Sequence, residues 1–266
     1  MERSTVKILF IGDIVGRPGR GAVKKILPEL IKKYNIDFVI ANGENLAAGN
    51  GMTLETYKEM IAAGVDYFTS GNHIWNNKDI ISHLDNSAVR VLRPANYPKG
   101  VPGRGITILE KGGKKIVLVN LLGRVFIEED LEDPFRMAEN IAKEHNLPIL
   151  IDFHAEATSE KIAFGRYLDG KVAAVVGTHT HVQTSDETIF PGGSGFITDV
   201  GMTGPIESVL GVEKEIIIER FLTQLPVSHK VASGEVCFCG VIIEIDPEKK
   251  ITTHIERINK NLNLAE

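Results

Sequence analysis

Short apolar runs alternate with helical segments in the first part of the chain, and this alternation limits the fold more than any other feature of the sequence. The runs VKILFIG at 6–12 and DFVIAN at 37–42 are rich in β-branched residues, as strands are. Between them, the polar stretch 12–21 is expected to be a loop, and residues 22–34 have apolar positions at helical spacing. A second helix is expected from Thr53 to Ala63. Repeated strand and helix, with polar loops after the strands, indicate an α/β arrangement.

The middle of the chain is expected to be antiparallel, which makes the sheet arrangement mixed. Strands are predicted at Gly105–Leu109 and Ile116–Leu121, joined by a turn at 111–114. A short strand at Arg90–Arg93 precedes them, and a helix is expected from Pro134 to His145. Further strand-like runs lie at 148–154, 172–181, 193–200, 237–246 and 251–258. The sequence therefore predicts an α/β or α+β sandwich of mixed sheets, in a single domain that spans residues 1–266.

Composition excludes several classes of protein. A hydrophobic fraction of 43% and a charged fraction of 24% are ordinary for a globular protein. The net charge of −5 provides no field for broad nucleic-acid binding or for an acidic membrane surface. The opening apolar run is too short for a signal peptide, so we expect a cytoplasmic protein without a membrane partner. Cys237 and Cys239 are expected to be small, reduced core residues on one face of a strand.

Polar clusters follow the predicted strands at the points where the strands end. These clusters are Asp13, Glu44 with Asn45, Asn72 with His73, His154, and the GTHTH segment that contains His179 and His181. Loops beyond the carboxyl ends of strands commonly carry the active-site groups of α/β proteins, because several such loops converge. The placement of these clusters at the ends of strands is therefore more informative about function than the residue types they contain.

Each cluster has an ordinary structural explanation when it is taken alone. An aspartate after a strand is usually a turn former, and a lone histidine is more often a hydrogen-bonding group than a ligand. Together, however, carboxylate, amide and imidazole groups suit iron, manganese or zinc. A P-loop and a dinucleotide-binding glycine motif are both missing from the sequence. The joint pattern favours a metal site.

The ordered set GD, GEN, GNH, an isolated histidine and GTHTH resembles the calcineurin-like metallophosphoesterase superfamily. Two positions depart from the usual superfamily pattern: Val15 stands where a histidine is usual, and Glu44 stands where a bridging aspartate is usual. Both departures are shared by the YmdB-like branch, which the chain resembles through GDIVGRPGR, NGENLAAGNG, SGNHIWN, DFHAEATSEK, GTHTHVQT and ITDVGMTGP. The resemblance spans nearly the whole chain and implies two facing mixed sheets flanked by helices.

The resemblance also implies a ligand set for two metal ions. One ion would be bound by Asp13, Glu44, Asn45 and His181, and the second by Glu44, Asn72, His154 and His179. Glu44 would bridge the ions, and Asn45 would replace the ligand lost with the missing histidine. The ions are expected to be divalent or mixed-valence transition metals, with iron ranked before manganese and zinc.

His73 directly follows a predicted ligand, and we interpret it as the general acid that protonates the leaving oxygen; positioning of substrate or of a loop is the alternative. Trp75 and Asn76 come just after it and could border a base or ribose, although core packing explains Trp75 equally well. Arg17 and Arg20 are expected to be solvated and are not placed in the site.

The resemblance implies a phosphodiesterase that hydrolyses 2′,3′-cyclic nucleoside monophosphates by attack of a metal-bridging hydroxide. One alternative is a dinuclear hydrolase of C–N or ester bonds, since activated water serves those reactions too. Another is a metal-dependent regulatory or RNA-associated protein that senses nucleotides with little turnover. The expected partner is a small phosphodiester or cyclic nucleotide. The sequence leaves open whether the protein forms a homo-oligomer, because it has no heptad pattern.

Overall fold

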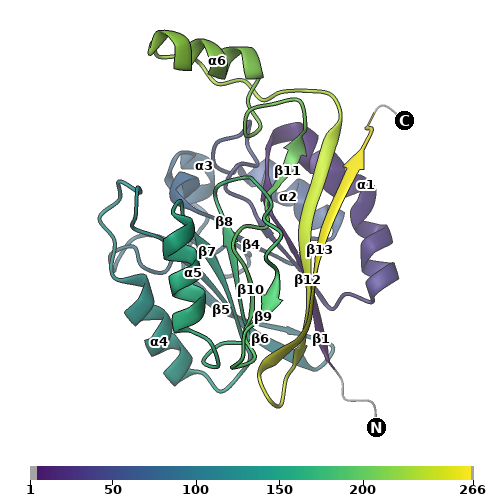
Figure 1. Cartoon of the computed structure of the whole chain (residues 1–266), viewed down its shortest axis with the longest axis vertical. Helices are drawn as coiled ribbons and strands as arrows, with labels where there is room; N and C mark the ends of the chain where they lie inside the picture. Colours follow the sequence, from purple (N-terminus) through teal and green to yellow (C-terminus); the bar gives the residue numbers. More distant parts are fainter. Residues whose placement is uncertain (1–4, 265–266) are drawn as a thin grey trace.

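The first of two β-sheets carries the two ends of the described chain. The computed structural model describes residues 5–264 (Figure 1). Seven strands form this sheet in the order β2-β11-β12-β1-β3-β4, with β13 beyond β12. Strand β1 pairs parallel to β3 and antiparallel to β12, so the sheet is mixed. The strands are β1 (Val6–Ile11), β2 (Asp13–Ile14), β3 (Phe38–Asn42), β4 (Tyr67–Thr69), β11 (Met202–Pro205), β12 (Val236–Asp246) and β13 (Ile251–Leu262).

The second sheet has six strands in the order β5-β6-β7-β8-β10-β9. Strands β5 and β6 form the predicted antiparallel hairpin, and Gly112 and Gly113 both have positive φ at its turn. Strands β6, β7, β8 and β10 run parallel to one another. The strands are β5 (Ile106–Lys111), β6 (Lys114–Leu122), β7 (Ile149–His154), β8 (Ala174–Thr178), β9 (Thr188–Ile189) and β10 (Gly195–Ile197).

Strands in both sheets bury side chains on both faces, which produces four layers. In β1, Ile8 and Phe10 face the second sheet, whereas Leu9 and Ile11 pack toward the helices on the other side. Helices α1 (Gly16–Tyr34) and α2 (Leu54–Ala63) cover the first sheet. Helices α4 (Pro134–Glu144) and α5 (Thr158–Tyr167) cover the second sheet (Figure 1). The predicted sandwich of two mixed sheets flanked by helices is therefore confirmed.

Two predictions about local structure were wrong. Helix α1 begins at Gly16 rather than at residue 22, so most of the glycine-rich stretch is helical and not a loop. Gly19 explains the glycine content, because a Cβ there would collide with the carbonyl oxygen of Thr203 on β11. Glycine here permits close helix–strand packing. The strand expected at 90–93 is reduced to isolated bridges, Phe68 with Val91 and Leu92 with Arg104.

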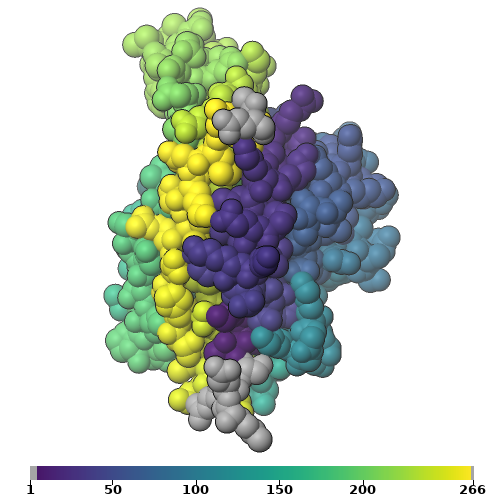
Figure 2. All heavy atoms as spheres, turned by 90° about the vertical axis from the view of Figure 1, so that its right-hand side faces the viewer, coloured from purple at the N-terminus to yellow at the C-terminus, as the bar shows by residue number. Residues whose placement is uncertain are grey.

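Helix α6 (Lys214–Thr223) projects from the body of the molecule, and both views show it standing apart (Figures 1 and 2). None of its residues is buried, and Phe221 and Leu222 are among the most exposed apolar side chains. The short helices η1 (Asn72–Trp75) and α3 (Lys78–Ile81) lie against the body. Among the described residues, no helix is long and apolar enough to cross a membrane.

Candidate metal centre

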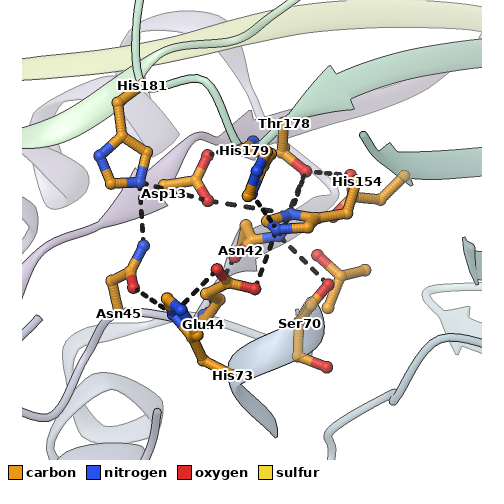
Figure 3. Close-up of polar contacts among 12 residues, drawn as sticks. Asp13, Asn42, Glu44, Asn45, Ser70, His73, His154, Thr178, His179 and His181 are labelled. Carbon is orange, nitrogen blue, oxygen red and sulfur yellow. Dashed lines mark hydrogen bonds and ion pairs between the residues drawn. The ribbon is translucent and has the colours of Figure 1, made fainter. Parts of the chain in front are cut away.

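The polar clusters that follow the strands meet at one end of the two sheets (Figure 3). Asp13 begins β2 directly after β1, while Glu44 and Asn45 lie in the turn after β3. Asn72 and His73 open η1 after β4. The second sheet contributes His154 at the end of β7, and His179 and His181 just after β8. Facing sheets with parallel strands thus deliver all the clusters to a common region.

Glu44 stands between two histidines at the middle of this cluster. Its Oε1 lies 3.1 Å from Nδ1 of His73, and its Oε2 lies 2.9 Å from Nε2 of His154. Nδ1 of His179 lies 3.0 Å from the same His154 nitrogen. Glu44, His154 and His179 each offer a ligand atom, and these three atoms lie within 4.8 Å of one another. This group has the spacing and chemistry of a metal-binding site.

Asn45 joins the other side of the cluster. Its Nδ2 lies 2.9 Å from Nε2 of His181, and its Oδ1 lies 3.1 Å from Nδ1 of His73. The His181 Nε2 is also 3.9 Å from Oδ1 of Asp13. The other ring nitrogen of His181 donates to the carbonyl oxygen of Leu210, at 3.0 Å. That bond fixes the ring so that Nε2 of His181 is directed at the cluster.

A hydrogen-bonded chain behind His154 fixes the orientation of its ring. Thr178 donates its hydroxyl proton to Asp152, at 2.7 Å, and therefore accepts from Nδ1 of His154, at 2.8 Å. Nδ2 of Asn42 donates to the second Asp152 oxygen at 3.0 Å. Ligand histidines are commonly held in this way, which leaves Nε2 free to bind. The sequence prediction missed Asp152, Asn42 and Thr178, although a polar residue within an apolar strand run is the signal that could have identified them.

Burial and proximity shift the pKa values of the charged groups. Burial raises the pKa of Asp13. Burial would also raise the pKa of Glu44, but His154 and His73 beside it lower that pKa well below its usual range. Burial would lower the pKa of His154, but Glu44 and Asp13 raise it to about 9. Burial, together with the charge of His154, lowers the pKa of His179 to about 3. His154 and His73 therefore favour the charged form of Glu44, whereas burial disfavours the charged form of Asp13.

Unpaired buried oxygens test whether a cation fits the cluster. Oδ1 of Asp13 and Oδ1 of Asn72 are buried and have no hydrogen-bond partner in the described part of the chain. A buried oxygen that lacks a partner costs about 1–3 kcal/mol, unless a cation or a water satisfies it. Oxygen and imidazole donors together suit divalent transition metals. The residues present therefore fit such an ion.

The loop after β8 holds its two histidines in an uncommon backbone conformation. The φ angle is 99° at His179 and 65° at His181. Positive φ is rare for residues other than glycine and costs on the order of 1–3 kcal/mol, so such residues concentrate at functional sites. The expectation that an extended segment would carry both histidines was wrong: β8 ends at Thr178, and the loop directs the two rings.

Gly71 packs directly against the cluster from the η1 side. A Cβ at this position would overlap Oε2 of Glu44 and Nε2 of His154. Its φ is −145°, which any residue can adopt, so the requirement for glycine here is steric rather than conformational. The absence of a side chain lets the backbone before Asn72 approach the centre.

A cavity of about 480 Å³ opens beside the cluster, where His73 and His181 line it. His229 also lines this cavity, although no motif in the sequence surrounds it. The other lining residues are Val15, Ala47, Ala48, Gly49, Asn50, Leu210, Gly211, Val212 and Val231. Small and apolar residues thus make up most of the lining.

Neighbouring residues considered from the sequence have structural roles. Trp75 packs edge-on against Tyr97, with ring centroids 5.3 Å apart, so it belongs to the core. Asn76 donates to Oδ1 of Asn50 at 2.7 Å. Arg20 binds Glu59 and the Leu46 carbonyl oxygen, both at 2.6 Å, outside the cluster.

Known proteins resemble this chain over nearly its whole length. Residues 9–258 match the YmdB-like protein family. The chain is 50% identical to the 2′,3′-cyclic-nucleotide 2′-phosphodiesterase of Bacillus subtilis, over 95% of this chain and 96% of that protein. A solved hypothetical protein from Thermus thermophilus is 41% identical with a TM-score of 0.90, covering 96% of this chain and 99% of that one.

A solved novel phosphatase from Mycoplasma pneumoniae is 35% identical with a TM-score of 0.92, covering 98% of this chain and 95% of that one. The Haemophilus influenzae NAD nucleotidase shares the fold alone, at 17% identity and a TM-score of 0.63, and this chain covers 56% of it. The family match and the two close structures span nearly the whole chain. The chain belongs to the YmdB-like family.

Proposed function

We propose that this chain is a dinuclear metal-dependent phosphodiesterase that hydrolyses 2′,3′-cyclic nucleoside monophosphates. The observation that carries the proposal is the position of buried Glu44, whose two oxygens each contact a different histidine of the cluster. A carboxylate with partners on both sides is suited to bridge two cations. The half-identical Bacillus subtilis relative, by its name, acts on 2′,3′-cyclic nucleotides.

The donors divide into two sets around Glu44. Asp13, Asn45 and His181 would hold one ion with Glu44, and Asn72, His154 and His179 would hold the other. Support comes from the contacts of His181 with Asn45 and of His179 with His154. When bound, the two cations would lower the pKa of water between them and offset negative charge on the phosphoryl group. Iron is our first assignment, with manganese and zinc as alternatives.

His73 is placed to move a proton. Its Nδ1 is held by Glu44 and Asn45, each at 3.1 Å, and the residue lines the cavity. The second ring nitrogen, Nε2, then donates a proton to the departing ribose oxygen while water adds to phosphorus. The P–O2′ bond breaks, and the product is a nucleoside 3′-phosphate. His73 is thus our general acid.

The cavity beside His73 would hold the nucleoside. Its volume of about 480 Å³ lies within the usual range for small-ligand sites. Gly49 and Gly211 keep it open: a Cβ on either would press against Val231 or Val15 respectively. Few polar side chains line it, so we expect weak discrimination among bases.

A substrate panel with metal analysis tests the proposal. Protein purified without oxygen is analysed for metal and assayed on 2′,3′-cyclic nucleotides, simple phosphodiesters, amides and esters. We expect about two transition-metal ions per chain and fastest turnover of the cyclic nucleotides. The Glu44→Ala protein should lose both metal and turnover, while His254→Ala, at an exposed histidine near the start of β13, should retain both.

Faster hydrolysis of amides or esters would replace the proposal with a C–N or ester hydrolase. Tight nucleotide binding with negligible turnover would favour a nucleotide sensor. Full activity of the Glu44→Ala protein would exclude the bridging role.

A further inference from the structure

A second cavity, of about 730 Å³, lies away from the metal centre. Helix α4 forms one wall, and the segment from Arg93 to Ile106 forms the other. None of its lining residues belongs to the metal cluster or to the cavity beside His73. Its apolar lining residues are Ala95, Ile106, Met137 and Ile141. The cavity is therefore an independent space with an apolar wall.

Four cationic side chains line the same cavity: Arg93, Lys99, Arg104 and Arg136. Among the described residues, none of the four has a carboxylate within ion-pair distance. Arg104 is engaged by neutral oxygens, those of Tyr67, Ser87 and Val89. Because guanidinium groups pair best with carboxylates or phosphates, four cations that form no ion pair with a carboxylate around one space indicate a site for an anion.

Arg93 is the most informative of the four. One terminal nitrogen donates to the carbonyl oxygens of Pro94 and Ala95, at 2.8 and 3.3 Å. Its Nε is buried and has no partner in the described part of the chain. Burial lowers the pKa of this guanidinium, which means that its charge is poorly solvated. An anion in the cavity would add counter-charge to that of Asp85.

Three acidic residues, Glu132, Asp133 and Glu144, also line the cavity. Asp133 caps α4 by accepting from the backbone N–H of Phe135, and it forms an ion pair with Arg124 at 3.3 Å. Its charge is therefore already compensated. Glu132 and Glu144 are exposed to solvent, where water screens them. The half-buried Arg93 is compensated only by the charge of Asp85, which forms no ion pair with it.

We propose that this cavity binds an organic phosphate of the mononucleotide class. The phosphate would lie on Arg93, Lys99 and Arg136, since planar guanidinium groups match phosphate oxygens. The base or another flat ring would pack on Met137 and Ile141. The volume accommodates such a ligand with its ring. This site does not depend on the proposed phosphodiesterase activity.

Calorimetric titration with 5′-AMP separates this site from the metal centre. The metal-loaded protein and the Glu44→Ala protein are titrated side by side, because Glu44→Ala removes turnover and weakens any binding at the metals. We expect 5′-AMP to bind the Glu44→Ala protein with one site per chain. Adenosine and inorganic phosphate should each bind at least about tenfold more weakly, because each lacks half of the contacts.

Exposed cations provide variants that leave the fold intact. Lys99→Gln with Arg136→Gln, made in the Glu44→Ala protein, should weaken 5′-AMP binding about tenfold or more. Lys143→Gln is the matched control, since Lys143 is exposed on α4 but does not line the cavity. Arg93→Gln should abolish binding, with circular dichroism as the check on folding.

Four results would overturn the proposal. The first is no binding of 5′-AMP to the Glu44→Ala protein, and the second is unchanged affinity in the double variant. If adenosine binds as tightly as 5′-AMP, the anion site is excluded. If inorganic phosphate binds as tightly as 5′-AMP, the ring contact is excluded.

Discussion

Nδ1 of His73 lies 3.1 Å from Oε1 of Glu44, so the carboxylate at the middle of the cluster also orients the ring that borders the cavity. The side chain of His73 is 33% exposed to solvent, whereas the side chain of Glu44 is only 2% exposed. A buried carboxylate thus fixes one nitrogen of a histidine whose other nitrogen can reach a ligand. In the proposed mechanism, this pairing places the general acid beside the metal-binding groups but outside the set of ligands.

Replacing His73 should slow the reaction without removing metal. The His73→Ala protein should lose turnover by about 10²–10⁴, the usual contribution of a general acid. The loss should shrink for substrates with good leaving groups, because these need no proton. Steady-state rates over a leaving-group series, with metal analysis of the same samples, measure this. An equal loss across the series would instead indicate that His73 positions the substrate.

Asn45→Ala should weaken one ion selectively. The Asn45 amide contacts His181 and His73 but neither His154 nor His179. We expect metal content to fall toward one ion per chain and the affinity of the weaker ion to drop about tenfold or more. Competition with a chelator, read by elemental analysis, measures the affinity. Unchanged affinity for both ions would exclude Asn45 as a ligand.

Thr178→Val should disturb the metal centre although Thr178 is not one of the proposed ligands. The change keeps the shape of the side chain but removes the hydroxyl that links His154 to Asp152. Loss of such a support typically costs about 10–100-fold in metal affinity or activity. Thr178→Ser should restore both. Thr253→Val, which removes a hydroxyl on the exposed edge of β13, is the control and should change neither.

Gly71→Ala should expel metal while the fold persists. The added methyl group would overlap the carboxylate of Glu44 and the ring of His154, so one of them must move. We expect metal binding and turnover to be lost together, with a near-native circular dichroism spectrum. Gly21→Ala is the control, because its Cβ would meet only the flexible end of Leu264. Retention of both ions in Gly71→Ala would contradict this packing.

The apolar residues of α6 should contribute little to stability. Phe221 is 73% exposed, whereas Phe68 is fully buried in the core beside the helices. Phe68→Ala should cost about 3–5 kcal/mol in the free energy of unfolding. Phe221→Ala should change it by no more than about 0.5 kcal/mol. Urea denaturation of the two variants tests the contrast, and a large loss in Phe221→Ala would show that α6 packs in solution.

The sequence predicted the sandwich and the clusters after its strands, because both depend on local periodicity. Strands β1, β3 and β7 read clearly, and Asp13, Glu44 and His154 follow from where they end. Cys239 is buried on β12 as expected, whereas Cys237 is only half-buried; their sulfur atoms lie 3.4 Å apart. The single-domain assignment stays a prediction.

Long-range packing explains what the sequence did not predict. Helix α1 includes glycines that look like loop residues, because Gly19 must fit against β11. Helices α5 and α6 were not predicted, since neither has a strong apolar face along its length. The Asp152–Thr178 link joins neighbouring strands, and no spacing along the chain indicates which strands pair.

The contact at Gly71 also has a consequence for inheritance. Every amino acid that a glycine codon can reach by a single base change carries a β-carbon, and at this position that carbon would overlap Glu44 and His154. We therefore expect every missense change of codon 71 to disturb the contacts of Glu44 and His154. A protein without this glycine can keep the centre only if the Glu44 carboxylate or the His154 ring is displaced. We therefore expect this position to resist gradual substitution.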